Sequence, residues 1–345
     1  MIFLNSCMDQ ADKKLVLLHT KQLWEHNISK GENIFITGAT GFFGKSLLDT
    51  FVYINEVLNL ESKIIVLTRD KAKFLSEYPQ FNTSEIEFVE GTLSTFEYPK
   101  QPISYIIHAA NDLNENDNSI NIDQRPFIVG TKRILELARQ KKVKAILHTS
   151  SGAVYGSKSM SQLISEDQYN DNNIDQFFDY YATNKRHIEK LCDDFYLQYH
   201  VPSKIARCFA FVGPYLPLDL HYAIGNFIKN YVENSPLIIK GDGLAYRSYL
   251  YSADLCIWLW TILFNGKPCR PYNVGSDEYY TLLEIAKKIT GFKNSLLPIN
   301  VLNEKTAVKA SWYIPSIQRA KNELQLEVYT TLDLAIEKTI LSYTN

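Results

Sequence analysis

Three glycines at positions 38, 41 and 44 constrain the fold of this chain more than any other feature. They follow the short apolar run Asn33–Thr37, typical of a buried strand, and lead into a helical pattern from Lys45 to about Leu58. Gly38 allows a sharp turn, Gly41 lets the backbone approach a pyrophosphate, and Gly44 lets the helix pack on the strand. The N–H groups that open the helix would face the phosphates. An ordinary turn is the alternative, but the strand–turn–helix context favours a dinucleotide site.

Short apolar runs alternate with helical patterns from residue 33 onward. Continuous apolar strands are typical of a parallel sheet that is covered on both faces. We therefore predict an α/β fold with a Rossmann-type doubly wound parallel sheet, which binds ligands at the carboxyl ends of its strands. The predicted strands are Asn33–Thr37, Lys63–Thr68, Glu85–Glu90, Tyr105–His108, Ala145–Thr149 and Ser203–Cys208, and the helices between them include residues 127–142 and 179–199.

The pattern along the chain predicts three parts. Residues 1–30 form an N-terminal helical extension, whose role the sequence does not reveal. Residues 31–210 form the dinucleotide-binding Rossmann domain, to which a segment at about 271–276 returns. Most of residues 211–345 form a smaller C-terminal substrate-binding lobe, because glycines and prolines interrupt the pattern after about residue 210. The elements predicted in this lobe include a helix at Ala223–Asn234 and strands at Leu237–Ile239 and Tyr246–Tyr251.

Charge and cysteine usage argue against several classes of partner. The 36 Lys and Arg residues and 38 Asp and Glu residues give a net charge of −2 without a basic block, so we expect no nucleic-acid or membrane partner. Five scattered cysteines without Cys-x-x-Cys spacing are typical of reduced thiols, so we expect no metal. The apolar run Leu255–Phe264 is about half as long as a bilayer requires, and Met1–Cys7 lacks a basic signal-peptide start. We therefore expect a cytoplasmic protein.

Tyr181 and Lys185 stand four positions apart at the start of a predicted helix, which places both side chains on one face. An ammonium about 4 Å from a phenol is worth roughly 4 kcal/mol at an effective dielectric of about 20, enough to make the phenol a usable acid or base. In a chain with 22 tyrosines this spacing also arises by chance. Ser151 adds a hydroxyl where a predicted strand ends, and together with the glycine turn these residues favour a catalytic set.

The order of the motifs resembles that of the extended short-chain dehydrogenase/reductases that modify nucleotide sugars, the NAD-dependent epimerase/dehydratase family. The resemblance covers about residue 31 to the C-terminus. The matching segments are Thr-Gly-Ala-Thr-Gly-Phe-Phe-Gly (37–44), His-Ala-Ala (108–110), Gly-Thr (130–131), Ser-Ser-Gly-Ala-Val-Tyr-Gly (150–156), Tyr-x-x-x-Lys (181–185), Arg-Cys-Phe-Ala-Phe-Val-Gly-Pro (207–214), Gly-Asp-Gly-x-x-Tyr-Arg-Ser-Tyr (241–249) and Tyr-Asn-Val-Gly-Ser (272–276).

The resemblance implies a role for each residue of the site. Tyr181 is the general acid/base on a sugar oxygen, Ser151 hydrogen-bonds that oxygen, and Lys185 holds the nicotinamide ribose and lowers the pKa of the tyrosine. Arg247 clamps the pyrophosphate of a nucleotide-sugar substrate, with a surface salt bridge as the alternative. The family also implies a homodimer through the helices near 127–140 and 180–199. The further implied cofactor contacts are Gly38, Thr40, Gly41, Phe42, Phe43, Gly44, Thr68, Arg69, Ala109, Ala110 and Thr149, and the further substrate contacts are Asn111 and Asn226, with helix packing as the alternative for Asn226.

Four positions depart from the family pattern. Dehydratases of the family carry an Asp-Glu pair directly after the catalytic hydroxyl residue, where this chain has Gly152 and Ala153, neither of which can move a proton. Decarboxylase-like members usually have a glutamate at the second of these positions, so both reactions are disfavoured. Thr92 replaces an acidic residue after the third strand, and Ala210 replaces an asparagine. The adenine contacts and the substrate-diphosphate contacts at these positions therefore stay open.

The end of the second predicted strand bears on the choice of cofactor. NAD-specific members place an acidic residue there for the ribose 2′-OH, whereas this chain has Thr68 and then Arg69, which suits a 2′-phosphate. Asp70 comes two positions late and is expected to face away. We therefore favour NADP over NAD, and an NADPH-dependent reductase of a nucleotide-linked 4-keto(-6-deoxy)hexose in deoxysugar or surface-glycan biosynthesis. The alternatives are a nucleotide-sugar 4-epimerase with tightly bound NAD, and a non-catalytic dinucleotide-binding sensor.

Overall fold

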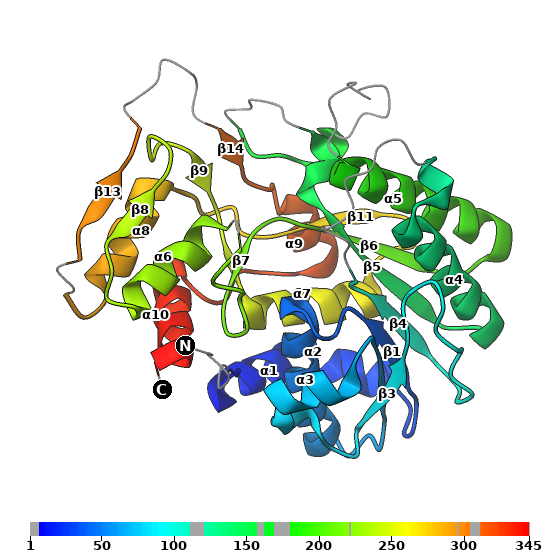
Figure 1. Ribbon diagram of the computed structural model, residues 1–345. Helices are drawn as coiled ribbons and strands as arrows, with labels where there is room; N and C mark the ends of the chain where they lie inside the picture. Colours follow the sequence, from blue (N-terminus) through cyan, green and yellow to red (C-terminus); the bar gives the residue numbers. More distant parts are fainter. Residues whose placement is uncertain are drawn as a thin grey trace.

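A seven-stranded parallel sheet forms the centre of the computed structural model (Figure 1), which describes residues 7–110, 121–156, 162–168, 180–220, 222–294, 297–303 and 311–344. The strand order is β11-β6-β5-β4-β1-β2-β3, with β1 between β2 and β4. The predicted α/β Rossmann-type sheet is confirmed. Its strands are β1 (Ile34–Thr37), β2 (Ile64–Thr68), β3 (Ile86–Glu90), β4 (Tyr105–His108), β5 (Ala145–Ser151), β6 (Ser203–Cys208) and β11 (Pro271–Val274).

Helices cover both faces of the sheet (Figure 1). Within β1, Ile36 belongs to the core on one face and Phe35 to the core on the other, and both side chains are fully buried. This two-sided burial explains why β1 is a continuous apolar run in the sequence. The first layer contains α1 (Gln10–Asn27), α2 (Phe42–Val57) and α7 (Ser252–Asn265), and the second contains α4 (Pro126–Lys141) and α5 (Tyr180–Tyr199).

The N-terminal helix α1 is part of the main core. Its Trp24 packs edge-on against Trp260 of α7, with the ring centroids 4.7 Å apart, and both rings are fully buried. Asp12 accepts hydrogen bonds from the Tyr251 hydroxyl at 2.7 Å and from Lys338 Nζ at 2.7 Å, which ties α1 to the C-terminal helix α10 (Leu332–Thr344). Helix α1 therefore covers α7 and is bound to α10.

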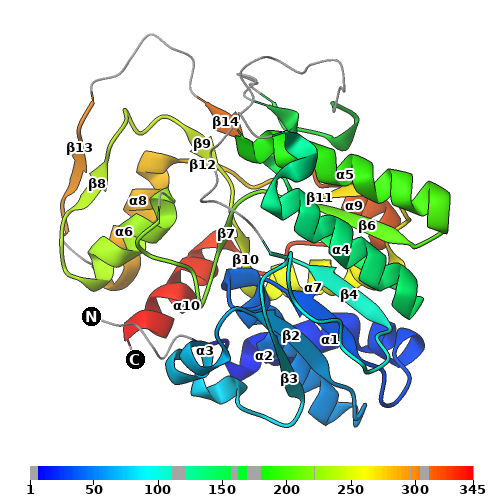
Figure 2. The same cartoon turned by 45° about the vertical axis from the view of Figure 1, so that its right-hand side comes forward.

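In the described part of the chain, three small sheets and the helices α6 (Ala223–Val232), α8 (Leu282–Gly291) and α10 lie beside the strand ends (Figure 2), and we call this part the lobe. The prediction of one strand over Tyr246–Tyr251 is wrong, because β9 (Tyr246–Arg247) and β10 (Leu250–Tyr251) pair with different partners. The other elements of the lobe are β7 (Phe211–Val212), α6 (Ala223–Val232), β8 (Leu237–Ile239), β12 (Tyr280–Thr281), α8 (Leu282–Gly291), β13 (Ile299–Val301) and β14 (Trp312–Tyr313).

Within the described ranges, no helix combines the length and the apolarity needed to cross a bilayer. Helix α7 corresponds to the longest apolar run of the sequence, and nearly all of its residues are buried against the sheet and α1. The apolar run is therefore explained by packing inside the protein.

Candidate active site

The glycine turn connects β1 to α2 at the point where the sheet changes winding direction, next to the end of β4. Gly38 has a φ of +73°, and a Cβ added there would lie 2.5 Å from backbone atoms of Ala109 and Ala110. A Cβ at Gly44 would lie 2.1 Å from the Cα of Ala39, whereas a Cβ at Gly41 would meet only the Gly38 carbonyl oxygen, at 3.3 Å. Gly38 and Gly44 are thus required by close backbone packing, and Gly41 leaves open space in front of the turn.

The first turn of α2 is suited to binding a pyrophosphate. Gly41 is the N-cap, and within the described structure no side chain caps this helix; its first turn also lacks an acidic residue. The opening N–H groups have no partner inside a helix, and the helix dipole favours negative charge there. Thr40 and Gly41 are exposed, and Phe43 packs edge-on against Phe211 of the lobe at 4.9 Å. These features fit a dinucleotide.

An exposed arginine directly follows the end of β2. Thr68 is buried, Arg69 is exposed, and Asp70 caps the short helix α3 (Lys71–Glu77) by accepting from the Lys73 N–H at 2.8 Å. The Asp70 carboxylate thus caps α3, and that it faces away from the cofactor stays a prediction. Glu90, at the end of β3, accepts from the Lys71 N–H at 3.0 Å.

A neutral histidine holds the segment after β4 in place. The Thr131 hydroxyl donates to the Phe127 carbonyl at 2.8 Å, so it accepts from His108 Nε2 at 3.0 Å. His108 Nδ1 is then left to accept from the Thr37 hydroxyl at 2.7 Å, and Thr37 Oγ1 accepts from the Ala110 N–H at 3.2 Å. Burial, with a smaller effect of Lys185, lowers the pKa of His108 to about 3, so the ring is uncharged at neutral pH. This series of hydrogen bonds fixes the backbone of Ala110 against β1.

The catalytic candidates come from β5 and α5. Ser151 ends β5 and accepts from the Ala153 N–H at 3.1 Å, which opens a short 3₁₀ turn. Lys185 is 2% exposed, donates to the Thr149 carbonyl at 2.8 Å and lies 5.7 Å from the centre of the Tyr181 ring. Burial lowers the pKa of Lys185 to about 8, so its ammonium stays charged at pH 7. An ammonium therefore stands beside the phenol, as the four-residue spacing predicts.

A buried ion pair joins β6 to α5 close to the end of β5. Arg207 of β6 binds Glu189 of α5 through Nε and Nη2, at distances of 2.7–3.2 Å, and the two side chains are 3% and 6% exposed. Ser150 donates to Glu189 Oε1 at 2.5 Å. Burial disfavours the charge on Arg207, yet the adjacent Glu189 raises the pKa of the guanidinium above its ordinary value. Glu189, one helical turn after Lys185, thus bonds both Arg207 of β6 and Ser150 of β5. These bonds fix α5 relative to the end of β5.

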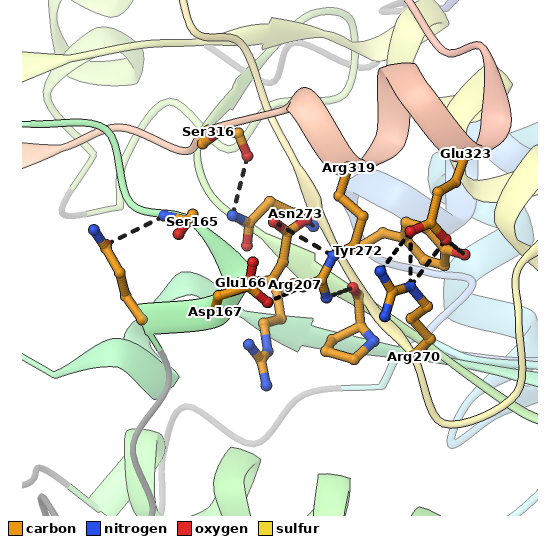
Figure 3. Close-up of polar contacts among 12 residues, drawn as sticks. Ser165, Glu166, Asp167, Arg207, Arg270, Tyr272, Asn273, Ser316, Arg319 and Glu323 are labelled. Carbon is orange, nitrogen blue, oxygen red and sulfur yellow. Dashed lines mark hydrogen bonds and ion pairs between the residues drawn. The ribbon is translucent and has the colours of Figure 1, made fainter.

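Asn273 of β11 extends this network towards the C-terminal segment (Figure 3). Its side-chain oxygen accepts from the Tyr155 hydroxyl at 2.6 Å, and Arg207 donates to that same hydroxyl at 3.0 Å. Its amide nitrogen donates to the Ser316 carbonyl at 3.1 Å, and its backbone N–H donates to Glu166 at 2.8 Å. The network therefore joins the end of β5 to the strand at the edge of the sheet.

The residues that the family resemblance assigns to the substrate lie in the lobe. Arg247 lies on β9, is half-buried and donates to the Ser311 hydroxyl at 3.2 Å. It is the register partner of Tyr313 on β14, and the Tyr313 hydroxyl lies beside Gly152, where an added Cβ would be 2.6 Å from it. Asn226 lies on α6 and is partly exposed, and Asn111 falls outside the described residues. The structure thus brings Arg247 near the catalytic candidates through Tyr313, which the sequence did not single out.

The model of the NAD dependent epimerase/dehydratase family matches residues 34–275, which is more than half of the chain. The chain belongs to this family. Thus the family predicted from the ordered motifs is confirmed, and the glycine turn and the Tyr-x-x-x-Lys helix both lie inside the matched region.

Relatives in the epimerase/dehydratase family carry names of different reactions. UDP-glucuronic acid decarboxylase 2 of Arabidopsis thaliana is 26% identical over 75% of this chain and 57% of its own length. The dTDP-D-glucose 4,6-dehydratase of Dictyostelium discoideum is 29% identical over 75% of this chain and 61% of its own length. The chain therefore spans less than two thirds of either relative. The UDP-glucuronic acid 4-epimerase of Bacillus cereus, solved with UDP-glucuronic acid and NAD, shares the fold with a TM-score of 0.73 at 23% identity, covering 90% of this chain and 98% of that chain.

Gly152 gives a physical reason why this family member lacks an acid directly after its serine. A Cβ at Gly152 would lie 2.6 Å from the Tyr313 hydroxyl and 2.9 Å from the Phe209 ring. An acidic side chain there would require both rings to move. Among the described residues, no group of three or more His, Cys, Asp or Glu side chains could hold a metal ion.

Proposed function

We propose that this protein is an NADPH-dependent reductase of a nucleotide-linked 4-keto(-6-deoxy)hexose. The observation that carries the proposal is the exposed Arg69 at the end of β2, with the neighbouring Asp70 engaged in capping α3. An arginine at this place suits a ribose 2′-phosphate, and the neighbouring acid, Asp70, uses Oδ1 to cap α3. Net reductases consume NADPH, whereas epimerases and dehydratases of the family recycle bound NAD.

Each residue of the site has a separate role in such a reduction. When bound on the glycine turn, NADPH supplies the hydride for the keto carbon. Tyr181 donates the proton to the sugar oxygen, and Ser151 donates a hydrogen bond to that oxygen. Lys185, charged at pH 7, stabilises the tyrosinate that the proton leaves behind. Arg247 binds the diphosphate of the substrate, for which its planar guanidinium is suited.

The positions after Ser151 favour simple reduction over reactions with an additional proton transfer. Elimination of water across the sugar ring requires groups that remove and deliver further protons. Gly152 and Ala153 carry no such group, and the space beside Gly152 is filled by the rings of Tyr313 and Phe209. We therefore do not propose a 4,6-dehydratase or a decarboxylase, although relatives carry those names.

A nucleotide-sugar 4-epimerase is the second candidate. Its support is the similarity in fold to the Bacillus cereus UDP-glucuronic acid 4-epimerase, whose structure holds NAD. Such an enzyme would use Ser151, Tyr181 and Lys185 in both an oxidation and a reduction of one carbon. It would purify with NAD bound and would need no added NADPH.

Assembly and location also stay proposals. We propose a homodimer through α4 and α5, because Leu197 and Tyr199 near the end of α5 are 73% and 42% exposed. A cytoplasmic location and the lack of nucleic-acid and membrane partners remain predictions from composition.

The test mixes the purified protein with NADPH and a panel of dTDP-, CDP-, GDP- and UDP-linked 4-keto sugars, and follows the absorbance of reduced nicotinamide. We expect stoichiometric oxidation of NADPH with at least one sugar. Tyr181→Phe should abolish turnover, whereas Tyr196→Phe, on the same helix, should not. If NADPH is not oxidised with any sugar and NAD is released when the protein is denatured, the epimerase replaces the reductase.

A further inference from the structure

Arg125 carries a positive charge that the fold buries against neutral groups. Its side chain is 5% exposed. Nη1 donates to Asn184 Oδ1 at 2.6 Å, the guanidinium carbon lies 4.0 Å from the centre of the Tyr180 ring, and Nε has no hydrogen-bond partner in the described structure. Removing a charge from water is costly, and an amide oxygen and a ring face offset that cost only in part. Folding stability alone therefore gives no reason for an arginine at this position.

The guanidinium lies between the N-terminal ends of two helices. Arg125 is the N-cap of α4, and within the described residues its side chain makes no capping hydrogen bond. Its two contacts, Tyr180 and Asn184, belong to the N-terminal end of α5. Helix N-termini carry a partial positive charge, so a cation placed between two of them opposes both dipoles. Positive charge is therefore concentrated at this point of the fold.

The residues that Arg125 contacts are the chain neighbours of the catalytic pair. Tyr180 directly precedes Tyr181, and Asn184 directly precedes Lys185. Residues four positions apart lie on one face of a helix, and the next residue along the chain is turned by about 100°. Tyr180 and Asn184 therefore face α4, and the catalytic pair lies on the adjacent face of the same helical turn.

The titratable groups that lie around the catalytic pair from other elements are neutral at pH 7. They are His108 of β4, His148 of β5, Cys208 of β6 and Tyr313 of β14. Burial lowers the pKa of both histidines, to about 3 for His108, and raises the pKa of the Cys208 thiol to about 12 and that of the Tyr313 phenol above its ordinary value. None of these groups offsets a positive charge.

Two acids on neighbouring elements are engaged with other cations. Asp123 lies on the exposed turn η2 (Ile122–Gln124) and binds Lys132 Nζ at 2.6 Å and His187 Nε2 at 3.3 Å. Glu189 of α5 is paired with Arg207. In the described part of the chain, neither acid forms an ion pair with the buried guanidinium of α4. The positive charge at the start of α5 is thus left to act on the active site.

The proposed reduction creates a negative charge on this helical turn. Hydride passes from NADPH to the keto carbon and the proton passes from Tyr181 to the sugar oxygen, so that a tyrosinate remains until it takes a proton from water. A nearby cation favours the ionised phenol. We propose that Arg125 is a positioning residue, which holds the turn of α5 that carries Tyr181 and Lys185 and adds a second positive charge that stabilises the tyrosinate. The inference rests on the proposed function for the direction of proton transfer.

A titration without turnover tests this role. The ultraviolet absorbance of tyrosinate in the purified protein, minus that of the same protein with Tyr181→Phe, gives the ionisation of Tyr181. Arg125→Met removes the charge and should raise the midpoint by about half to one pH unit. Arg125→Lys keeps the charge and should stay near the wild type. Arg133→Met is the matched control, because Arg133 also lies on α4 with its guanidinium over a ring, that of Tyr98 at 5.1 Å, and it should leave the midpoint unchanged.

Turnover gives a second readout. With Arg125→Met we expect kcat to fall about three- to tenfold at neutral pH and KM for the nucleotide sugar to change less than about twofold, because the charge stabilises a group formed during the reaction. Arg125→Gln is a second neutral variant, which keeps a donor for Asn184 and should behave in the same way.

An unchanged midpoint or an unchanged kcat in a neutral variant that folds would overturn the proposal. Failure of both neutral variants to fold would overturn it as well, because Arg125 would then serve the structure alone. Failure of the proposed function is separate. It appears as a wild-type protein that oxidises no NADPH with any 4-keto sugar, whereas the titration of Tyr181 requires neither sugar nor added NADPH.

Discussion

Replacing Glu189 by Gln should destabilise the protein strongly, because it removes the negative charge that the buried Arg207 guanidinium contacts through two nitrogens. The substitution keeps the shape of the side chain and removes only its negative charge. Arg207 is 3% exposed, and it also donates to the Tyr155 hydroxyl, which carries no charge. Removing one partner of a buried pair typically costs about 3–5 kcal/mol.

The size of the effect can be converted into a melting temperature. At an average unfolding entropy of about 2.1 cal/mol/K per residue, the 345-residue chain has an unfolding entropy of about 0.7 kcal/mol/K. A loss of about 3 kcal/mol therefore lowers Tm by about 4 °C. Activity should fall as well, because Ser150 and α5 both depend on the Glu189 carboxylate.

Thermal unfolding followed by circular dichroism measures this shift, and an exposed ion pair provides the control. Arg139 also binds Glu136 through two nitrogens, at 2.8 Å and 2.6 Å, but these side chains are 44% and 35% exposed. Glu136→Gln should therefore cost less than about 1 kcal/mol. Equal shifts in Tm for the two variants would refute the argument that burial makes the Arg207–Glu189 pair critical.

Three further predictions follow from the cofactor site and the catalytic lysine. Gly38→Ala should lower the free energy of unfolding by about 2–4 kcal/mol and abolish NADPH binding in calorimetry. Gly31→Ala is the control, because Gly31 has a similar φ of +79° and no described atom within 4 Å, and this variant should bind NADPH normally. Equal NADPH affinities of the two variants would contradict the close packing at Gly38. The pKa of Lys185 is lowered from 10.5 to about 8, so the cost of burying its charge is present below pH 8 and is lost as the pH rises to 10.5. In urea unfolding, the stability of Lys185→Met relative to the cofactor-free wild type should therefore fall by about 3 kcal/mol over that range. A difference that stays constant with pH would contradict the lowered pKa of Lys185. Arg69→Asp should reverse the preference for NADPH over NADH by about tenfold to a hundredfold in kcat/KM, and an unchanged ratio would remove Arg69 from the cofactor site.

Much of the fold could be predicted because its local and tertiary preferences agree. The strands β1 and β2 at the centre of the large sheet are buried along their whole length, so their apolar runs are visible without knowledge of their neighbours. The small strands of the lobe are different. Tyr246–Tyr251 has the composition of one strand, but two residues at each end pair with separate sheets, and pairing partners so far along the chain leave no local pattern.

The site could be predicted where its residues lie in one motif. The spacing of Tyr181 and Lys185 is set by the helix, and the glycine turn is set by backbone packing around Gly38. Tyr313 was missed because it reaches the site beside Gly152 only through the tertiary arrangement of β14, and a lone tyrosine in a tyrosine-rich chain carries no signal. The structure also explains Gly152, which from the sequence is simply a departure from a family pattern.

The transfer of deuterium from NADPH labelled at the nicotinamide C4 tests the central claim most directly. The protein is incubated with labelled NADPH and the keto sugar that it accepts, and the product is examined by mass spectrometry and NMR. We predict one deuteron per molecule of product, on the carbon that carried the keto group, with one NADPH oxidised for each. Turnover of a nucleotide sugar without deuterium in the product and without loss of NADPH would contradict the reductase.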